Sequence, residues 1–497
     1  MLGRFQRIYM RPCRILDGKG LLKRNSKLLK RMPHGLLLSY QKERELYKAR
    51  LVAKGFSQTQ GVDFNETFAP VAKLNTVRVL ISLAVNLDWP LHQLDVKNAF
   101  LNGNVDEEVY MTIPPGLQVV GGSNKVCKLN RSLYGLKQSP RAWFEKFTTV
   151  ILQHGFSQSL TDHTLFFKMD ENGQRTILLV YVDDIILTGD DTKEIVHIKG
   201  VLRQMFETKD LGQLRYFLGM EVARSKAGIV INQRKYVLDL LKDTGLLGCK
   251  PVDTPMDANI SFNPTSTPCA NKERFQNIVG KLLYLSHTRP DITFAVNVLS
   301  QHMHQPSVEH MQATLRVLKY LKGTPGHGLI FRKSLDRSVK LYTDSSWAGS
   351  LTHRRSTSGY CSFLWGNMVT WRSKKQAVIS RSSAEAEFRA LAQGICEGIW
   401  LLKLLKDIHP TAATGFELFS DNKSAIQLAK NPVQHDRTKH VEIDRHFIQE
   451  NLKNGVVTLS YTQSAHQLAD IFTKALPRQS FVSFLGKLGI YNIYTPA

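Results

Sequence analysis

The sequence predicts a protein of about three domains that combine helices and strands, with a mixed α/β domain beginning near Val339. Three observations lead to this expectation. The chain has 497 residues, 42% of them hydrophobic, which is enough to build folded cores. An apolar, β-prone stretch at 178–187 contains two adjacent aspartates. After Val339, strand-like patterns alternate with helical ones, and several of them end near an acidic residue.

The chain carries a large positive charge. It has 66 Lys and Arg residues against 42 Asp and Glu residues, which gives a formal net charge of +24 at pH 7. A polyanionic partner, most simply nucleic acid, explains this balance better than an incidental basic surface.

Cysteine usage and hydropathy indicate an intracellular protein. The 6 cysteines are scattered without a Cys-x-x-Cys pair, which favours reduced thiols and argues against a zinc site. No apolar run approaches the length of a membrane span, so we expect no membrane partner. We expect a cytoplasmic or nuclear location. The Arg-rich residues 1–34 are also compatible with an organelle transit peptide, although an irregular leader is the favoured interpretation.

Residues 178–187 are the most informative stretch. They predict a strand, a tight turn and a second strand, with Asp183 and Asp184 at the tip. Burying an unpaired aspartate there would cost several kcal/mol, so the pair must be solvated, hydrogen-bonded or bound to a metal. Paired carboxylates on a rigid hairpin suit Mg²⁺, which prefers hard oxygen ligands. The alternative is an ordinary hairpin with a polar turn, although such turns usually favour Gly or Asn.

This motif also carries a family resemblance. The run Tyr181-Val182-Asp183-Asp184 resembles the palm motif of reverse transcriptases, and its flanks resemble copia-type LTR retrotransposons. In the segment 91–103, Asp95 matches the first palm carboxylate, and the segment 132–143 is nearly a signature of the copia family. The resemblance extends from about Tyr47 to about Gly486.

The resemblance implies an α+β right-hand polymerase with palm, fingers and thumb. It makes Asp95, Asp183 and Asp184 the catalytic and metal-binding cluster, with Mg²⁺ as cofactor at two ions per active site. The implied activity is that of an RNA-directed DNA polymerase. Its implied partners are an RNA template, a DNA primer and deoxynucleoside triphosphates.

Three further residues are candidates for binding the nucleotide. Lys48 and Arg50 alternate on a short predicted strand at 48–55, where basic groups grip triphosphate oxygens or, alternatively, protect an exposed sheet edge. The family resemblance favours nucleotide binding over protection of a sheet edge as the role of Lys48 and Arg50. Phe100 lies where related enzymes carry an aromatic ring under the nucleotide sugar. The alternative is that Phe100 is an ordinary core residue.

The last third of the chain predicts a second group of carboxylates. Its expected elements are a strand at 340–344, a hairpin at 359–371 with the turn Gly366-Asn367, a long helix from Ser382, a strand at 417–421 and a late helix containing Asp470. The long helix is expected to bury a stripe made of Phe388, Leu391, Ile395 and Ile399.

Two acids on that long helix can be separated by local rules. The run Ser382-Ser383-Ala384-Glu385 fits a capping box, which gives Glu385 a structural role. Glu387 is two residues further on and points to a different face of the helix. Glu387 is therefore the better ligand candidate.

The order in which four acids occur, on a strand, a helix, a strand and a helix, resembles that of the ribonuclease H fold. These acids are Asp344, Glu387, Asp421 and Asp470. The resemblance implies that these residues are catalytic and bind two Mg²⁺ ions to cleave the RNA strand of an RNA–DNA hybrid. It also makes His466 a candidate for aiding product release. Arg354 and Arg355, in the loop after the first strand, are candidates for contacting the hybrid backbone.

The expected domain order is a basic, atypical leader at 1–40, fingers and palm at 41–240, thumb and connection at 241–335, ribonuclease H at 336–480 and a C-terminal tail at 481–497. The chain looks like part of a larger polyprotein. Copia-type enzymes usually carry a Trp- and Lys-rich fingers segment before the stretch that contains Lys48, and residues 1–40 do not resemble it. The alternative to an active polymerase is a decayed or repurposed element product that binds nucleic acid without polymerising.

Overall fold

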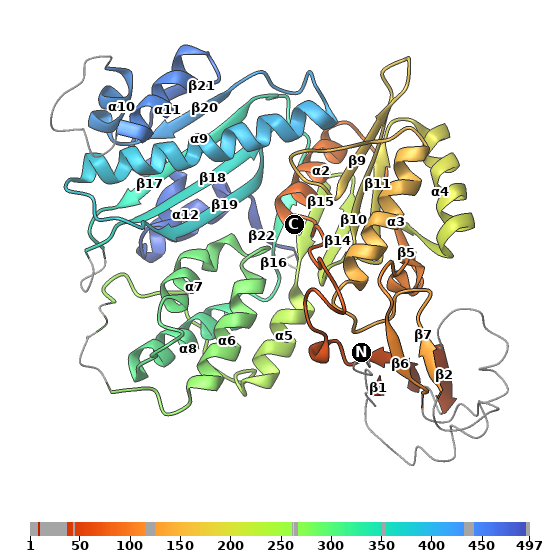
Figure 1. Cartoon of the computed structure of the whole chain (residues 1–497). Helices are drawn as coiled ribbons and strands as arrows, with labels where there is room; N and C mark the ends of the chain where they lie inside the picture. The colour runs from red at the N-terminus through yellow and green to blue at the C-terminus, as the bar shows by residue number, and fades with distance from the viewer. Residues whose placement is uncertain are drawn as a thin grey trace. The chain divides into compact units, whose positions relative to one another are not determined.

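The structure is a computed structural model. It describes residues 51–114, 125–260, 262, 267–349, 354–431 and 442–493, together with strand backbone at 8–9, 37–42 and 45–50. The chain forms two compact units: the first comprises Met1–Ala72 and His92–Gly212, and the second comprises Lys73–Leu91 and Gln213–Ala497. Figure 1 labels their helices and strands. Within the described residues, no helix combines the length and the apolar character needed to cross a membrane.

The first unit is built on a six-stranded sheet with the order β12-β5-β11-β10-β9-β8. Its strands are β12 (Thr208–Gln213), β5 (Leu91–Val96), β11 (Asp184–Gly189), β10 (Arg175–Tyr181), β9 (Leu165–Met169) and β8 (Ser157–Gln158). The strands β10 and β11 confirm the strand–turn–strand predicted at 178–187.

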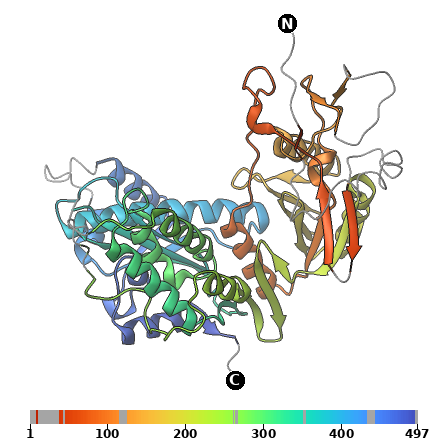
Figure 2. The ribbon, with the colours of Figure 1, turned by 90° about the horizontal axis from the view of Figure 1, so that it is seen from below.

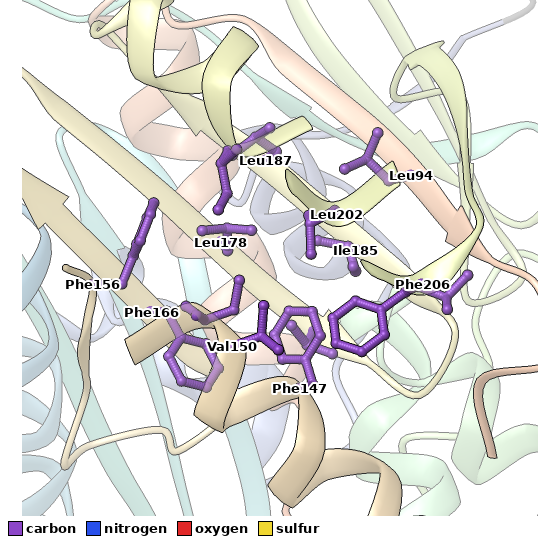
Figure 3. Packing of buried hydrophobic residues seen from close by; sticks show 14 of the residues in the cluster. Leu94, Phe147, Val150, Phe156, Phe166, Leu178, Ile185, Leu187, Leu202 and Phe206 are labelled. Carbon is purple, nitrogen blue, oxygen red and sulfur yellow. The ribbon is translucent and has the colours of Figure 1, made fainter. Parts of the chain in front are cut away.

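The helices α3 (Ser139–Gln153) and α4 (Thr192–Phe206) contribute to the core of this unit. Figure 3 shows their side chains packed against alternate residues of the strands, and the labelled members are Leu94, Phe147, Val150, Phe156, Phe166, Leu178, Ile185, Leu187, Leu202 and Phe206. Successive side chains of a strand point to opposite faces. Because Leu94 and Val96 face this core, Asp95 projects from the other face of β5.

The remaining described strands of the first unit are short. They are β1 (Ile8–Tyr9) paired with β4 (Val52–Ala53), β2 (Leu37–Lys42) paired with β3 (Glu45–Arg50), and β6 (Tyr110–Thr112) paired with β7 (Val126–Lys128). The strand predicted at 48–55 is thus divided between β3, β4 and the short helix η1 (Gly55–Ser57). Gly135 makes room for β4, because a Cβ atom at Gly135 would lie 2.1 Å from the carbonyl oxygen of Ala53.

The second unit begins with α2 (Leu74–Asn86), a helix whose residues from Thr76 to Asn86 are all buried. Its other helices before the last sheet are α5 (Arg234–Asp243), α6 (Lys272–Leu285), η3 (Pro290–Ile292), α7 (Thr293–Ser300) and α8 (Val308–Gly323). A five-stranded sheet has the order β13-β14-β15-β16-β22, with β13 (Tyr216–Phe217), β14 (Met220–Ser225), β15 (Gly228–Asn232), β16 (His327–Phe331) and β22 (Ile490–Asn492). Residues expected as a C-terminal tail therefore complete this sheet, after the helix α12 (Arg478–Lys487).

A second five-stranded sheet in this unit is mixed and has the order β19-β18-β17-β20-β21. The strands β17 (Val339–Ser346), β18 (Thr357–Leu364) and β19 (Asn367–Lys375) are antiparallel, whereas β20 (Phe416–Ser420) and β21 (Val457–Tyr461) run parallel to β17. The helices are α9 (Ser383–Ile408), α10 (Lys423–Lys430) and α11 (Glu442–Lys453). This arrangement confirms the predicted mixed α/β domain.

The long helix α9 packs along one face of this sheet (Figures 1 and 2). A Cβ atom at Gly394 would lie 2.4 Å from Thr343 Cγ2 of β17, so the helix and the strand are in close contact. Phe388, Leu391 and Ile395 are fully buried as predicted, whereas Ile399 is only half-buried.

The turn between β18 and β19 differs from the prediction by one residue. Leu364 pairs with Asn367, so the turn residues are Trp365 and Gly366, with φ of 52° and 79°. The side chain of Asn367 explains the shift, because its Oδ1 accepts from the Arg332 backbone N–H at 2.7 Å and its Nδ2 donates to the Arg332 carbonyl at 3.0 Å. These contacts hold Asn367 within the strand.

A buried ion pair connects η3 to α8 in the second unit. Arg289 and Asp291 are each 1% exposed, and their side chains meet at 2.7 Å. The Tyr320 hydroxyl donates to Asp291 at 2.6 Å, and Arg289 Nη1 donates to the Thr324 carbonyl at 2.8 Å. Burial opposes ionisation of Asp291, but the adjacent guanidinium outweighs it and lowers the pKa of this carboxyl.

Removing one partner of this pair should destabilise the second unit strongly. Asp291→Ala leaves the guanidinium buried without its counter-ion, which we expect to lower the free energy of unfolding by about 3–5 kcal/mol. Denaturant unfolding measures the difference. The matched control is Asp243→Ala, which breaks the exposed pair with Lys281 and should cost less than about 1 kcal/mol. Equal decreases in the free energy of unfolding of the two variants would contradict the idea that burial makes the loss of Asp291 costly.

Candidate functional site

The first group of carboxylates lies at the tip of the hairpin between β10 and β11. Tyr181 pairs with Asp184, so Val182 and Asp183 form a two-residue turn. Val182 has a φ of 55°, which is unfavourable for a β-branched residue. The indole N–H of Trp143 on α3 donates to the Val182 carbonyl at 2.7 Å. This bond holds the turn in the conformation that presents the two acids.

Asp95 on the neighbouring strand β5 completes this group. The Val96 N–H donates to the Asp183 carbonyl at 2.8 Å, and Gln93 Nε2 donates to Asp184 Oδ1 at 3.1 Å. Burial raises the pKa of Asp184, and the charges of Asp183 and Asp95 act in the same direction, against the hydrogen bond from Gln93. The three acids therefore repel one another at one sheet edge, and a cation would stabilise them.

The nucleotide-binding candidates lie in the same unit. Phe100 is half-buried on the short helix η2 (Ala99–Asn102), and its ring meets Tyr134 edge-on at a centroid distance of 5.1 Å. Lys48 and Arg50 pair through their backbone with Ser39 and Leu37 in the β2–β3 hairpin. Their side chains lie outside what the structure describes.

The second group of carboxylates is denser. Asp344 lies on β17, Glu387 on α9 and Asp421 directly after β20, and one oxygen of each lies within 4.8 Å of the others. Within the described residues, this is the one trio of potential metal ligands that meets so closely. Because β17 and β20 are parallel neighbours, the acids at their carboxyl ends reach the same edge of the sheet.

Burial shapes the electrostatics of this trio. Asp344 and Glu387 are 3% and 4% exposed, and the Ser345 N–H donates to Glu387 Oε1 at 2.8 Å. Burial raises the pKa of Glu387 well above its usual range, and the charges of Asp344 and Asp421 add to that effect. The Thr473 hydroxyl donates to Asp344 Oδ2. An excess of negative charge held in a buried site favours binding of a divalent cation.

Asp470 lies beside the trio on η6 (Leu468–Phe472), which is a short 3₁₀-helix and not the longer helix that the sequence suggested. The ammonium of Lys474 lies 2.9 Å from Asp470 Oδ2 and 4.0 Å from Asp344 Oδ2. Burial and the charge of Asp344 nevertheless raise the pKa of Asp470 to about 7. Within the described residues, its Oδ1 is buried without a hydrogen-bond partner, so this oxygen could serve as a metal ligand.

A glycine allows η6 to reach the site. Gly359 on β18 lies directly opposite Asp344, and a Cβ atom there would be 2.7 Å from both Phe472 Cβ and Thr473 Cγ2. Sequence reasoning missed Gly359, Thr473 and Lys474. The spacing of Lys474 four residues after Asp470 was the available signal, because such pairs adjoin on a helix.

The two acids of α9 have separate surroundings. The Ser382 hydroxyl accepts from the Glu385 N–H at 3.2 Å, as expected for an N-cap. The Glu385 carboxylate accepts from the Arg381 N–H at 2.7 Å and pairs with Arg389 at 3.1 Å. Glu387 instead joins the trio.

The remaining ribonuclease H candidates are a histidine near the sheet edge that carries the trio and two exposed arginines. Ser464 donates to Asp421 Oδ2 at 2.7 Å, and His466 belongs to the same short helix η5 (Ser464–His466). The His466 ring nitrogen Nδ1 lies 3.2 Å from the Lys487 ammonium. Arg354 and Arg355 are exposed.

Sequence similarity to known proteins places the chain in a family. Residues 34–258 match the family described as reverse transcriptase (RNA-dependent DNA polymerase). The chain is 42% identical to the retrovirus-related Pol polyprotein from transposon RE1 of Arabidopsis thaliana, over 90% of this chain and 30% of that protein. It is 32% identical to a putative transposon Ty5-1 protein of Saccharomyces cerevisiae, over 61% of this chain and 100% of that protein.

These matches define a reverse transcriptase-type protein of a mobile element. More particularly, the chain belongs to the copia-type family of retrovirus-related Pol polyproteins, as its motifs predicted. It spans 30% of the length of the RE1 polyprotein. Among solved structures, a foamy viral protease–reverse transcriptase in complex with double-stranded DNA covers 94% of this chain at 13% identity, but with a TM-score of only 0.20.

The raised pKa of Asp470 predicts a pH dependence of the metal-free protein. An aspartate in the unfolded chain has a pKa of about 4, whereas Asp470 in the folded chain has a pKa of about 7. The unfolded state therefore loses its proton first, so the stability of the second unit should fall as the pH rises from about 4 to about 7. Thermal unfolding in a chelator measures this slope. In Asp470→Asn the slope should be shallower, and an unchanged slope would contradict the shift.

Proposed function

We propose that the chain is an RNA-directed DNA polymerase with ribonuclease H activity. The observation that carries this proposal is the presence of two separate carboxylate groups, one in each unit, in a chain of the reverse transcriptase family. The net charge of +24 supports a nucleic-acid substrate. We assign palm and fingers to the first unit, and thumb, connection and ribonuclease H parts to the second.

In the proposed polymerase site, Asp95 and Asp183 hold two Mg²⁺ ions and Asp184 adds negative charge. Divalent ions supply activation of the primer 3′-hydroxyl and neutralisation of the leaving pyrophosphate at such a site. Trp143 fixes the turn that carries Asp183, and Gln93 orients Asp184. The proposed partners are an RNA template, a DNA primer and deoxynucleoside triphosphates, which Lys48, Arg50 and Phe100 help to bind.

In the proposed nuclease site, Asp344, Glu387, Asp421 and Asp470 hold two Mg²⁺ ions. Divalent ions supply activation of water and stabilisation of the leaving oxygen during phosphodiester hydrolysis. The mixed order of strands β19-β18-β17-β20-β21 and the place of the acids on it support a ribonuclease H assignment. The Ser345 N–H orients Glu387, while Thr473 holds Asp344.

A second candidate function is nucleic-acid binding without polymerisation. The observation that favours it is that residues 1–40, which precede the stretch containing Lys48, do not resemble the Trp- and Lys-rich fingers segment that copia-type enzymes usually carry there. A chain without complete fingers would keep its positive charge and bind polyanions, but would position the nucleotide poorly.

Primer extension tests the polymerase directly. The full chain with Mg²⁺, an RNA template and a DNA primer should extend the primer, and Asp183→Asn should abolish extension because it removes metal-binding charge with little change in volume. Duplex binding and thermal stability should change little in the variant. Extension by Asp183→Asn at the parental rate would refute the site assignment. Tight, salt-sensitive binding without any extension would support the binding function instead.

The nuclease should be separable from the polymerase. Glu387→Gln is expected to stop cleavage of RNA in a hybrid and to spare primer extension. Glu385→Gln is the matched control, because it alters a neighbouring acid that caps and pairs locally. It should retain cleavage and lower stability by about 1 kcal/mol at most. The reverse pattern, with cleavage lost only in Glu385→Gln, would show that the wrong acid has been assigned.

Phe100 is expected to exclude ribonucleotides. If its ring fills the volume that a 2′-hydroxyl needs, Phe100→Val should raise ribonucleotide incorporation relative to deoxyribonucleotide incorporation. If the ring is only a core element beside Tyr134, both incorporations should fall together with stability. The ratio of the two incorporation efficiencies, compared between the parent and the variant, distinguishes these outcomes.

A further inference from the structure

An exposed tryptophan lies next to the second carboxylate group. Trp347 directly follows β17, three residues after Asp344, and its side chain is 50% exposed. The indole Nε1–H donates to the Ser380 carbonyl at 2.9 Å. Because its polar atom is already bonded within the chain, the ring is held in one orientation and presents apolar surface to solvent.

The anchor of this tryptophan is itself buried. The Ser380 hydroxyl donates to Gln376 Oε1 at 2.9 Å, and Gln376 is 4% exposed. Gln376 Nε2 donates to the Ser358 hydroxyl at 2.8 Å and to the Ala386 carbonyl at 2.9 Å. Ala386 precedes Glu387 on α9, so hydrogen bonds through Ser380 and Gln376 tie the indole to the residue next to a member of the carboxylate trio. A single exposed apolar side chain is ordinary, but one fixed in this way relative to an acidic cluster has a defined position.

The surroundings of Trp347 favour a nucleic-acid partner over an apolar one. Arg381 follows Ser380, and Arg355 precedes Ser356, whose hydroxyl accepts from the Ala348 N–H at 3.2 Å; both arginines are exposed. Cations beside an aromatic surface match the phosphates and the stacked bases or sugars of a polynucleotide. The carboxylates alone would repel such a chain, so attractive contacts beside them are needed to hold it.

We propose that Trp347 is a contact site for the RNA–DNA hybrid whose RNA strand reaches the second carboxylate group, with its ring against a sugar or base of the bound duplex. This inference rests on the proposed nuclease function. Three residues of chain span at most about 11 Å. At roughly 3.4 Å of helix axis per nucleotide, and with the reach of the two side chains added, the ring meets the hybrid within a few nucleotides of the phosphate at the carboxylates. Gln376 and Ser380 act as positioning residues for this contact.

Tryptophan fluorescence tests the contact without requiring cleavage. In the full chain carrying Glu387→Gln, an RNA–DNA hybrid duplex should change the emission, and the component that is lost in Trp347→Phe belongs to residue 347. This difference signal isolates Trp347 from any hybrid bound at the first carboxylate group. A difference signal that does not respond to the hybrid overturns the proposal.

Cleavage kinetics provide the second test, in the chain with Glu387 intact. Trp347→Ala should raise the KM for hybrid cleavage about tenfold, as expected for the loss of one stacking contact, with kcat little changed. Trp347→Phe should retain most of the affinity because it keeps an aromatic ring. The matched control Leu335→Ala removes a fully exposed apolar side chain of the same unit and should leave the KM unchanged.

The outcomes separate this inference from the proposed nuclease. A KM for Trp347→Ala within about twofold of the parent overturns the contact site. Equal increases in KM for Trp347→Ala and Leu335→Ala overturn it as well, because any exposed apolar residue would then suffice. A fluorescence response at residue 347, together with no hybrid cleavage by the chain that keeps Glu387, would refute the nuclease function while supporting the contact.

Discussion

Mutual repulsion of carboxylates is the constraint on which both candidate sites depend. Each unit gathers acids at one edge of a sheet, where burial and neighbouring charge make ionisation costly. The fold meets this cost with fixed hydrogen-bond donors, namely Gln93 for Asp184 and the Ser345 N–H for Glu387. These donors orient the oxygens but do not neutralise the charge. The remaining imbalance is what a divalent cation would relieve.

The two sites resolve the repulsion differently. In the first unit Asp183 and Asp184 lie at a hairpin tip and Asp95 lies on the neighbouring strand β5, and all three are half-buried. In the second unit Asp344, Glu387 and Asp470 are almost fully buried, and the chain provides its own cation in Lys474. The ammonium lies 2.9 Å from Asp470 Oδ2 and 4.0 Å from Asp344 Oδ2, so it reaches Asp470 and one member of the trio. The second site is therefore partly neutralised before any metal binds.

Local patterns made the main elements predictable, and contacts between distant segments made the rest unpredictable. The hairpin at Asp183, the helix α2 and the N-cap at Ser382 follow from residues within a few positions of one another. Gly359 could not be identified, because its importance arises only when η6 packs against β18. Gln376 could not be identified for the same reason, since its partners Ser358 on β18 and Ala386 on α9 are 18 and 10 residues away in the sequence.

The predicted turn at Gly366-Asn367 failed for a related reason. The local sequence favours a glycine with an asparagine in the turn, but Asn367 bonds to the backbone of Arg332 and is held in β19. The Arg337 guanidinium lies 4.4 Å from the ring centre of Trp365, which favours that residue in the turn instead. Tertiary contacts therefore overrode the local turn preference by one position.

The helix α2 shows why linear domain boundaries describe this chain poorly. It lies in the sequence between segments of the first unit, yet it belongs to the second. Polar side chains at every fourth position of α2 bond it to the second unit. Arg78 donates to the Val369 carbonyl at 2.6 Å, and Ser82 donates to the Leu364 carbonyl at 2.9 Å. Asn86 Oδ1 accepts from the Ser334 N–H at 2.9 Å.

These bonds satisfy buried polar groups that would otherwise each cost about 1–3 kcal/mol. A fragment beginning at residue 336 would leave the carbonyls of Leu364 and Val369 without their α2 donors, and would also lack Ser334. Conversely, a fragment cut after the first unit would carry α2 without its partners, immediately before the strand that bears Asp95. A single cut on either side of α2 therefore exposes polar contacts that the intact second unit buries.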